Sequence, residues 1–239
     1  TIEEKTLALE KTGLQNLIIH EFTVDFSRLK SVNFIRDFLV NKLNMKHMVV
    51  GYDHHFGKNR EGTFENLLAL SELYDFKLHK IEPQNVEDVT ISSTKIRNAI
   101  AEGDIEKANS YLCCDFAING KVEKGNKVGY TIGFPTANIK LENNWKILPK
   151  DGVYAVKVFV EHLQFYGMLN IGVRPTIKDD SHTIEVHIFD FNKVIYNQNI
   201  KIEFSERIRG EKKFENLDAL KKQLQIDESK CKKIFNLLR

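Results

Sequence analysis

The first 112 residues alternate short apolar runs with segments in which apolar residues recur at helical spacing. The predicted strands lie at 17–20, 47–50 and 76–81, and the predicted helices at 1–13, 33–43, 65–74, 94–101 and 105–112. Strands this short and apolar are too hydrophobic to face water, and strands that alternate with helices are typical of a parallel sheet. We therefore expect a parallel sheet covered by helices in this part of the chain.

After Cys114 the pattern changes to strand-like alternation. The candidate strands, which are separated by Gly, Pro, Asn and Asp, lie at 116–122, 153–161, 164–170, 183–189 and 200–204. Such a series predicts a small antiparallel barrel or sandwich. From Leu217 to Leu238, apolar residues at spacings of three, four and seven indicate a helix laid against it. The chain is thus expected to be α+β, with one module at 1–114 and another at 115–239.

A ten-residue stretch beginning at Gly129 has the composition of a phosphate and metal site. Gly129 and Gly133 let backbone N–H groups approach an anion, and Pro135 fixes φ before the chain extends again. Thr136 and Asn138 stand two apart at the start of a strand, so both point to one face. Their oxygens suit Mg²⁺ with phosphates completing the shell. The alternative is an ordinary Gly/Pro turn whose Thr and Asn only satisfy local backbone groups.

A carboxylate and an imidazole share one face of a later strand. The period of two sends Ile184, Val186 and Ile188 to one face and Glu185 and His187 to the other. From periodicity alone Glu185 is a solvent-facing carboxylate, as most strand glutamates are. His187 is more simply interpreted as a cross-strand polar partner than as a catalytic group.

Composition narrows the classes of partner. A net charge of +2 is too small to indicate a nucleic acid partner, and no apolar run approaches the length of a membrane span. The three cysteines match neither a disulfide framework nor a zinc pattern. We expect a cytoplasmic monomer or weak oligomer that binds small phosphorylated ligands and neither nucleic acid nor membrane.

Several stretches resemble one bacterial family in order and spacing. The stretch 120–138, with its Gly-Phe-Pro-Thr-Ala-Asn run, resembles the signature of the riboflavin kinase domain, and 170–176 and 184–191 are similar to further blocks of it. Earlier in the chain, 51–57 and 91–97 resemble the FAD synthetase half. Nearly the whole chain is thus similar to the bifunctional riboflavin kinase/FAD synthetase family. A departure is Tyr130, where the family usually has Arg.

The resemblance implies transfer of the ATP γ-phosphate to the riboflavin 5′-hydroxyl, which gives FMN. In the matching positions Glu185 would be the catalytic base, and Thr136 and Asn138 would hold Mg²⁺ with ATP. The residues expected to bind substrate in this half are Gly125, Lys127, Gly129, Gly133, Pro135, Asn170 and Arg209. Arg209 is included because a loop arginine near a phosphotransfer site could clamp phosphate or order a flap over flavin.

The other half would bind ATP and FMN for adenylyl transfer. The residues expected at its nucleotide site are Gly51, Asp53, Phe56, Gly57, Ser92, Ser93, Thr94 and Arg97. Ser92 and Ser93 would cap a helix whose N-terminus binds anions, with the Arg97 cation one turn in, although a plain serine cap is the simpler alternative.

The sequence contains no Gly-x-Phe-Asp-Gly-x-His-x-Gly-His signature, with which this kind of nucleotidyltransferase grips ATP phosphates. The resemblance therefore implies a partial Rossmann-like α/β module followed by a riboflavin-kinase-type barrel with a C-terminal helix. We expect the chain to phosphorylate riboflavin and not to convert FMN to FAD at a useful rate. The alternatives are a non-catalytic flavin-binding module and a nucleotidyltransferase that acts on another substrate.

Overall fold

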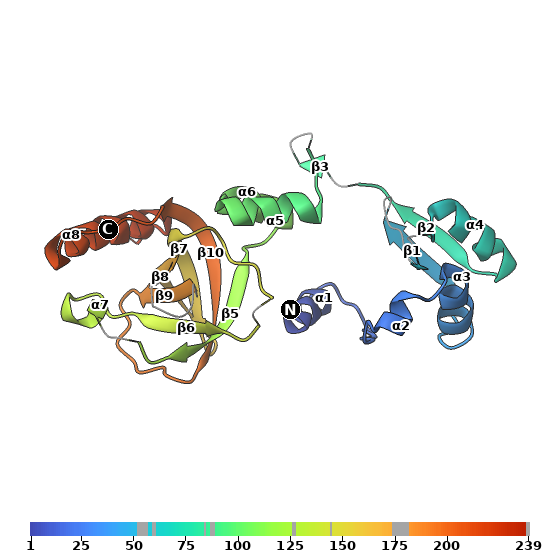
Figure 1. Cartoon of the computed structure of the whole chain (residues 1–239), viewed down its shortest axis with the longest axis horizontal. Coiled ribbons are helices and arrows are strands. Elements are labelled where there is room, and N and C mark those ends of the chain that lie inside the picture. The colour runs from blue at the N-terminus through green and yellow to red at the C-terminus, as the bar shows by residue number, and fades with distance from the viewer. Residues whose placement is uncertain are drawn as a thin grey trace. The chain divides into compact units, whose positions relative to one another are not determined.

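The computed structural model describes residues 1–51, 57–58, 61–83, 85–86, 89–125, 128–143, 145–173 and 182–237. The chain forms two compact units, Ile2–Thr90 and Ile91–Arg239, and each is described by itself. Figure 1 shows the helices and strands of both. The compact units divide between Thr90 and Ile91, whereas the predicted module boundary after residue 114 stays a prediction.

The first unit is built on two parallel strands, as expected. Its elements are α1 (Ile2–Glu10), α2 (Val24–Ser27), α3 (Ser31–Asn33), the π-helical segment η1 (Phe34–Val40), β1 (His47–Gly51), α4 (Phe64–Leu73), β2 (Lys77–Ile81), β3 (Asn85–Val86) and β4 (Val89–Thr90). β1 pairs with β2 in parallel, and β3 with β4 in antiparallel. The core joins one face of the β1–β2 pair to α4 and η1 through Ile35, Val50, Leu67 and Leu70, which are all buried.

The prediction of a strand at 17–20 is wrong. No strand forms there in the described part of the chain, and the side chains of Ile18 and Ile19 are 66% and 60% exposed. The run has strand composition, but β propensity reflects packing against neighbouring strands and burial more than an intrinsic backbone preference. Here β1 and β2 pair with each other, and the ladders of the described residues do not extend to this run.

The second unit is a closed barrel of six antiparallel strands in the order β10-β5-β6-β9-β8-β7. These strands are β5 (Ala117–Glu123), β6 (Ala137–Leu141), β7 (Gly152–Val160), β8 (Leu163–Val173), β9 (His182–Ile188) and β10 (Asn199–Arg209). The strands predicted after Cys114 are confirmed, and β6 continues from the strand start predicted at Thr136. The helices of this unit are α5 (Ser93–Glu102), α6 (Ile105–Leu112), α7 (Val128–Thr131) and α8 (Leu217–Ile234).

Alternating side chains fill the barrel. On β7 and β10 the inward residues Val156, Val158, Ile202 and Phe204 are fully buried, because successive side chains of a strand point to opposite faces. Tyr154 meets the Phe204 ring edge to face and donates its hydroxyl hydrogen to the Lys150 carbonyl. Burial raises the pKa of Tyr154 to about 12, so this phenol stays neutral over the physiological range.

The helix α8 begins at an Asn cap and packs on the outside of the barrel (Figure 1). The side chain of Asn216 accepts a hydrogen bond from the Ala219 N–H at 2.8 Å. The buried Cys231 of α8 packs in a cluster with Val153 and Met168. This confirms the predicted helix against the barrel.

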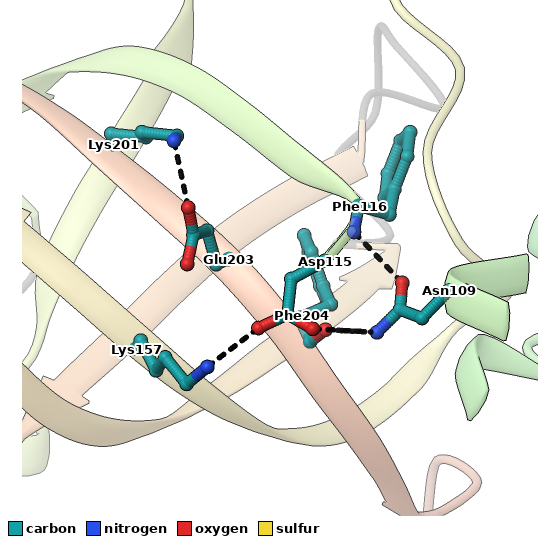
Figure 2. A network of polar contacts seen from close by, with 7 residues as sticks. All are labelled: Asn109, Asp115, Phe116, Lys157, Lys201, Glu203 and Phe204. Carbon is teal, nitrogen blue, oxygen red and sulfur yellow. Dashed lines mark hydrogen bonds and ion pairs between the residues drawn. The ribbon is translucent and has the colours of Figure 1, made fainter. Parts of the chain in front are cut away.

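The helix α6 is fastened to the barrel by a polar network, which Figure 2 shows. Asn109 accepts a hydrogen bond from the Phe116 N–H at 2.8 Å and donates to the Phe204 carbonyl at 2.9 Å. Its amide also donates to Asp115 at 3.3 Å, and the Lys157 ammonium lies 2.7 Å from the other Asp115 oxygen. The hydrogen bond to Asp115 raises the pKa of Lys157. The Asn109 side chain thus joins α6 to the residue before β5 and to β10.

Candidate functional site

A cavity of about 350 Å³ lies in the second unit, bordered by β8, β9, the end of β10 and α8. Its lining combines apolar and aromatic side chains with polar ones, and we call the part around Thr136, Asn170 and Glu185 its polar edge. The residues that line it are Gly129, Ile132, Phe134, Thr136, Val153, Met168, Leu169, Asn170, Gly172, Thr183, Glu185, His187, Arg209, Glu211, Lys212, Phe214, Leu220 and Leu224. We call it the main cavity.

Glu185 lies on the polar edge of this cavity between two carboxamides. In the ladders it pairs with Asn138 of β6 on one side and with Asn170 of β8 on the other. Paired residues of neighbouring strands share a face of the sheet, so the three side chains point to the same side. Ile184 and Val186, the neighbours of Glu185 along β9, are buried, as the alternation requires. The alternation in the sequence had placed Glu185 on the face opposite Ile184 and Val186, and it lies there in the structure.

Thr136, predicted as a metal ligand, does meet Glu185. Its hydroxyl donates to a carboxylate oxygen of Glu185 at 3.3 Å. A Cβ at Gly125 would overlap the amide of Asn138, so this glycine leaves the Asn138 side chain its space. The Thr136 hydroxyl thus contacts the Glu185 carboxylate, and the Asn138 amide lies on the same face of the sheet. Hydroxyl, amide and carboxylate oxygens are the ligands that Mg²⁺ prefers.

The oxygen set fits a cation that is shared with a phosphate. Among the described residues there is no group of three or more His, Cys, Asp or Glu that could hold a metal by protein ligands alone. Mg²⁺ typically takes one or two protein ligands and completes its shell with waters and substrate phosphates. Thr136 and Asn138 match that need.

The glycines before Thr136 make a tight turn. The Phe134 N–H donates to the Gly129 carbonyl at 2.8 Å, and a Cβ at Gly129 would overlap the Phe134 carbonyl. Gly133 has φ +87°, a left-handed conformation that an L side chain rarely adopts. These local reasons account for both glycines, and the turn presents Pro135 and Thr136 at the start of β6. Lys127, predicted to bind phosphate, lies outside the described residues.

A second cavity, also of about 350 Å³, lies on the other side of Thr136. It is lined by Val122, Tyr130, Pro135, Thr136, Ala137, Val186, Ile188, Phe191, Asn192, Lys193, Val194, Ile195 and Tyr196. Thr136 is therefore common to both cavities. Tyr130, which stands where the resembled family has Arg, is 73% exposed at the rim and brings an aromatic ring in place of a charge.

Arg209 lines the main cavity, but its guanidinium is paired within the protein. Its Nε and Nη2 each lie 2.9 Å from one oxygen of Asp227, a fully buried residue of α8. Gln223 donates to the other Asp227 oxygen, and Arg209 Nη1 donates to the Gly210 carbonyl. The Phe214 ring also lies 5.8 Å from the guanidinium carbon. Arg209 thus fastens α8 to β10, and its predicted substrate contact stays a prediction.

The expected nucleotide residues of the first unit can be followed only in part. Asp53 and Phe56 lie outside the described residues. Gly51 ends β1, and Gly57 has φ +76° and packs so closely that a Cβ would stand 2.8 Å from the Ser31 nitrogen. Packing alone therefore explains a glycine at position 57. A nucleotide role for these positions stays a prediction.

The other residues expected at that site begin α5, in the second unit. The Ser92 hydroxyl accepts from the Lys95 N–H at 3.4 Å, which is the plain serine cap. Ser93, Thr94 and Arg97 are exposed on the first turns of the helix. Their contact with nucleotide phosphate stays a prediction.

Sequence reasoning missed the far wall of the main cavity. Phe214 and Glu211 come from the loop between β10 and α8, and Met168 comes from β8. Phe214 had a signal in the sequence, since it is a lone aromatic in an otherwise polar loop. Met168 had none, because its position reads as ordinary core until the strands are closed into a barrel.

Family models match both parts of the chain. The model for riboflavin kinase matches residues 112–235, and the model for FAD synthetase matches residues 1–95. None of the described helices combines the length and apolar character needed to cross a membrane.

Curated bacterial relatives align with the chain nearly end to end. The bifunctional riboflavin kinase/FMN adenylyltransferase of Haemophilus influenzae is 39% identical over 236 residues, which is 98% of this chain and 76% of the relative. The enzyme of the same name from Bacillus subtilis is 37% identical over 100% of this chain and 75% of its own length. A Streptococcus pneumoniae crystal structure, described as a macrolide-efflux protein, superposes with TM-score 0.88 at 33% identity and covers 96% of this chain and 73% of its own.

Proposed function

The chain belongs to the bifunctional riboflavin kinase/FMN adenylyltransferase family, and we propose that Glu185 is the general base of its kinase reaction. The chain is a riboflavin kinase, which transfers the γ-phosphoryl group of ATP to the 5′-hydroxyl of riboflavin and yields FMN and ADP. One observation carries the residue assignment: the Glu185 carboxylate stands at the edge of an apolar cavity, with the Thr136 hydroxyl 3.3 Å away.

Riboflavin is assigned to the main cavity. Its flat isoalloxazine ring suits walls made of Phe134, Met168 and Phe214, since ligand pockets are mostly apolar with a few placed polar groups. The ribityl chain would then run toward the polar edge. There its 5′-hydroxyl reaches Glu185, which must be within hydrogen-bond distance of the proton that it accepts.

ATP is assigned to the second cavity. Thr136 borders both cavities, so a phosphate chain that enters from the second one ends beside the hydroxyl in the first. Tyr196 and Phe191 offer ring faces or edges for a base, and Lys193 offers a cation for a phosphate. Two cavities that meet at one threonine suit a reaction that joins two substrates.

Thr136 and Asn138 would hold Mg²⁺ beside the phosphates. Bound there, the ion would neutralise negative charge on the transferred phosphoryl group. The Thr136 oxygen can serve it with a lone pair while its hydrogen remains donated to Glu185, because a hydroxyl has one donor and two acceptor sites.

The residues of this chain mainly position the two substrates, and one of them removes a proton. As the 5′-oxygen attacks the γ-phosphorus, the bond from that phosphorus to the bridging oxygen of ADP breaks, and the hydroxyl proton passes to Glu185. Phosphoryl transfer depends chiefly on positioning and charge stabilisation, so the fixed Thr136–Glu185 contact is the feature that matters. The apolar walls exclude water that would otherwise take the phosphoryl group.

Incubation of the chain with riboflavin and Mg-ATP, followed by separation of the flavins, tests the proposal. FMN formed in step with ADP is expected. Bound but unchanged riboflavin would instead identify a non-catalytic flavin-binding module. The same separation, started from FMN, decides whether this chain makes FAD, an activity that the relatives' names include.

A further inference from the structure

A histidine on β9 holds the turn that precedes β6. The Pro135 carbonyl oxygen accepts a hydrogen bond from the imidazole of His187, with 2.7 Å between the oxygen and Nδ1. Since a carbonyl oxygen can only accept, Nδ1 carries a hydrogen. His187 stands two residues after Glu185 and so lies on the same face of β9.

This hydrogen bond acts where the backbone pairing stops. The described ladder between β6 and β9 ends at the pair Ala137–Val186 and does not reach Pro135. A backbone carbonyl beyond a ladder still needs a donor. The His187 side chain supplies one, and it thereby fixes a position that strand pairing leaves open.

The imidazole is itself held between two aromatic rings. Phe134 and Phe189 meet it edge to face, with centroid distances of 5.3 Å and 5.8 Å, and both are buried. A ring packed in this way loses little further freedom when a substrate binds. His187 is therefore a preorganised support for the turn.

We propose that His187 is a positioning residue for the kinase reaction, which acts by holding the Pro135 carbonyl so that Thr136 meets Glu185. This rests on the proposed function, in which Thr136 serves Mg-ATP. Thr136 is then fixed through two β9 side chains: His187 holds the preceding carbonyl, and Glu185 accepts from the hydroxyl at 3.3 Å. Loss of the first contact frees the turn and misplaces the second.

The test compares two amides that differ in where they place a donor. In His187→Asn the amide nitrogen lies near the former Nδ1 position and can still donate to Pro135, whereas in His187→Gln it lies near the former Nε2 position. The loss of one hydrogen bond predicts a fall in kcat/KM for Mg-ATP of about fivefold to tenfold in His187→Gln. His187→Asn should stay within about twofold of the wild type in kcat/KM for Mg-ATP. Because His187 also lines the cavity assigned to riboflavin, the expected signature of His187→Gln is a loss for Mg-ATP that exceeds any change in riboflavin affinity.

A double-mutant cycle shows whether the effect passes through Thr136. In a Thr136→Ala background, His187→Gln should lower kcat/KM for Mg-ATP little further, because the effects of coupled residues are not additive. His162→Gln, in the exposed hairpin between β7 and β8, is the matched control and should match the wild type. Three outcomes would each overturn this inference and leave the proposed function standing. They are equal loss in the Asn and Gln variants, no loss in His187→Gln, and additive effects in the cycle. A wild-type chain that forms no FMN would overturn the proposed function with it.

Discussion

Glu185 is surrounded by polar groups that fix the direction of its carboxylate. Asn138 and Asn170 flank it across the two ladders, and the Thr136 hydroxyl donates to it. A general base must lie within hydrogen-bond distance of the proton that it accepts, so the direction of this carboxylate matters. The neighbours of Glu185 along β9 point into the core, whereas Glu185 itself faces the polar edge of the cavity. Its side chain can therefore be replaced without disturbing the core.

Glu185→Gln should lower kcat for FMN formation by about 10²–10⁴-fold, because the amide keeps the shape of the side chain but cannot accept the proton. Riboflavin should still bind, which a flavin titration would measure. Glu161→Gln, in the exposed turn between β7 and β8, serves as the control of equal chemistry. A near-normal kcat in Glu185→Gln would remove this residue from the mechanism.

Thr136→Ala and Asn138→Ala should impair the use of Mg-ATP far more than the binding of riboflavin. Both residues lie on the proposed phosphate side, and the loss of a contact to a charged group predicts a KM for Mg-ATP raised by about tenfold or more. Steady-state kinetics at varied ATP and Mg²⁺ measure the change in KM, and a flavin titration measures riboflavin binding. If both variants lost riboflavin affinity while their ATP and Mg²⁺ dependence stayed normal, the metal assignment would be wrong.

At the scale of elements, alternation along the chain was enough to predict the barrel strands. β7 and β10 read directly as strands because their inward residues, among them Val156 and Phe204, repeat with a period of two. The run at 17–20 misled because composition does not reveal whether a partner strand exists. Periodicity shows which face of a segment is apolar, whereas a strand forms only when a second segment pairs with it.

The site could be predicted only where it is local in sequence. Thr136 and Asn138 stand two apart, and Glu185 lies on the polar face of its strand, so the sequence could place each on a face. Their meeting depends on the register Asn138–Glu185, which is set when the barrel closes. The wall that includes Phe214 comes from a loop distant in sequence, and the lone aromatic in that loop does not by itself indicate which cavity the ring lines.

The tie between α6 and the barrel predicts a stability effect at Asn109. Asn109→Ala removes the donor to the Phe204 carbonyl and the acceptor of the Phe116 N–H (Figure 2), and leaves two partly buried groups unpaired. The expected loss in free energy of unfolding is about 1–3 kcal/mol. Urea unfolding would measure it, with Asn98→Ala on the exposed face of α5 as the control. Equal stability of the two variants would show that the network contributes nothing.

At the scale of the molecule, the chemistry proposed for the kinase lies entirely in the unit Ile91–Arg239. Within that unit the main cavity has one wall from the barrel and one from α8, and the pair between the partly exposed Arg209 and the fully buried Asp227 joins them. Removing one partner of such a pair leaves an uncompensated buried charge. The cavity therefore keeps its shape only while α8 stays packed against the barrel. A buried side chain on the barrel-facing side of the helix can serve as a reporter of that packing.

Cys231 is that reporter. This residue of α8 is fully buried against Val153 and Met168 of the barrel, and burial, with the charge of Asp227, raises the pKa of its thiol to about 12. Cys113 and Cys114 are exposed. Because only an accessible thiolate attacks a disulfide reagent, the native protein should release two equivalents of thionitrobenzoate from Ellman's reagent rapidly, and the third only as α8 leaves the barrel or the chain unfolds. Cys231→Ala should keep the native count and lower the count in denaturant to two. Three thiols that react equally fast in the native protein would show that α8 does not seal the cavity wall.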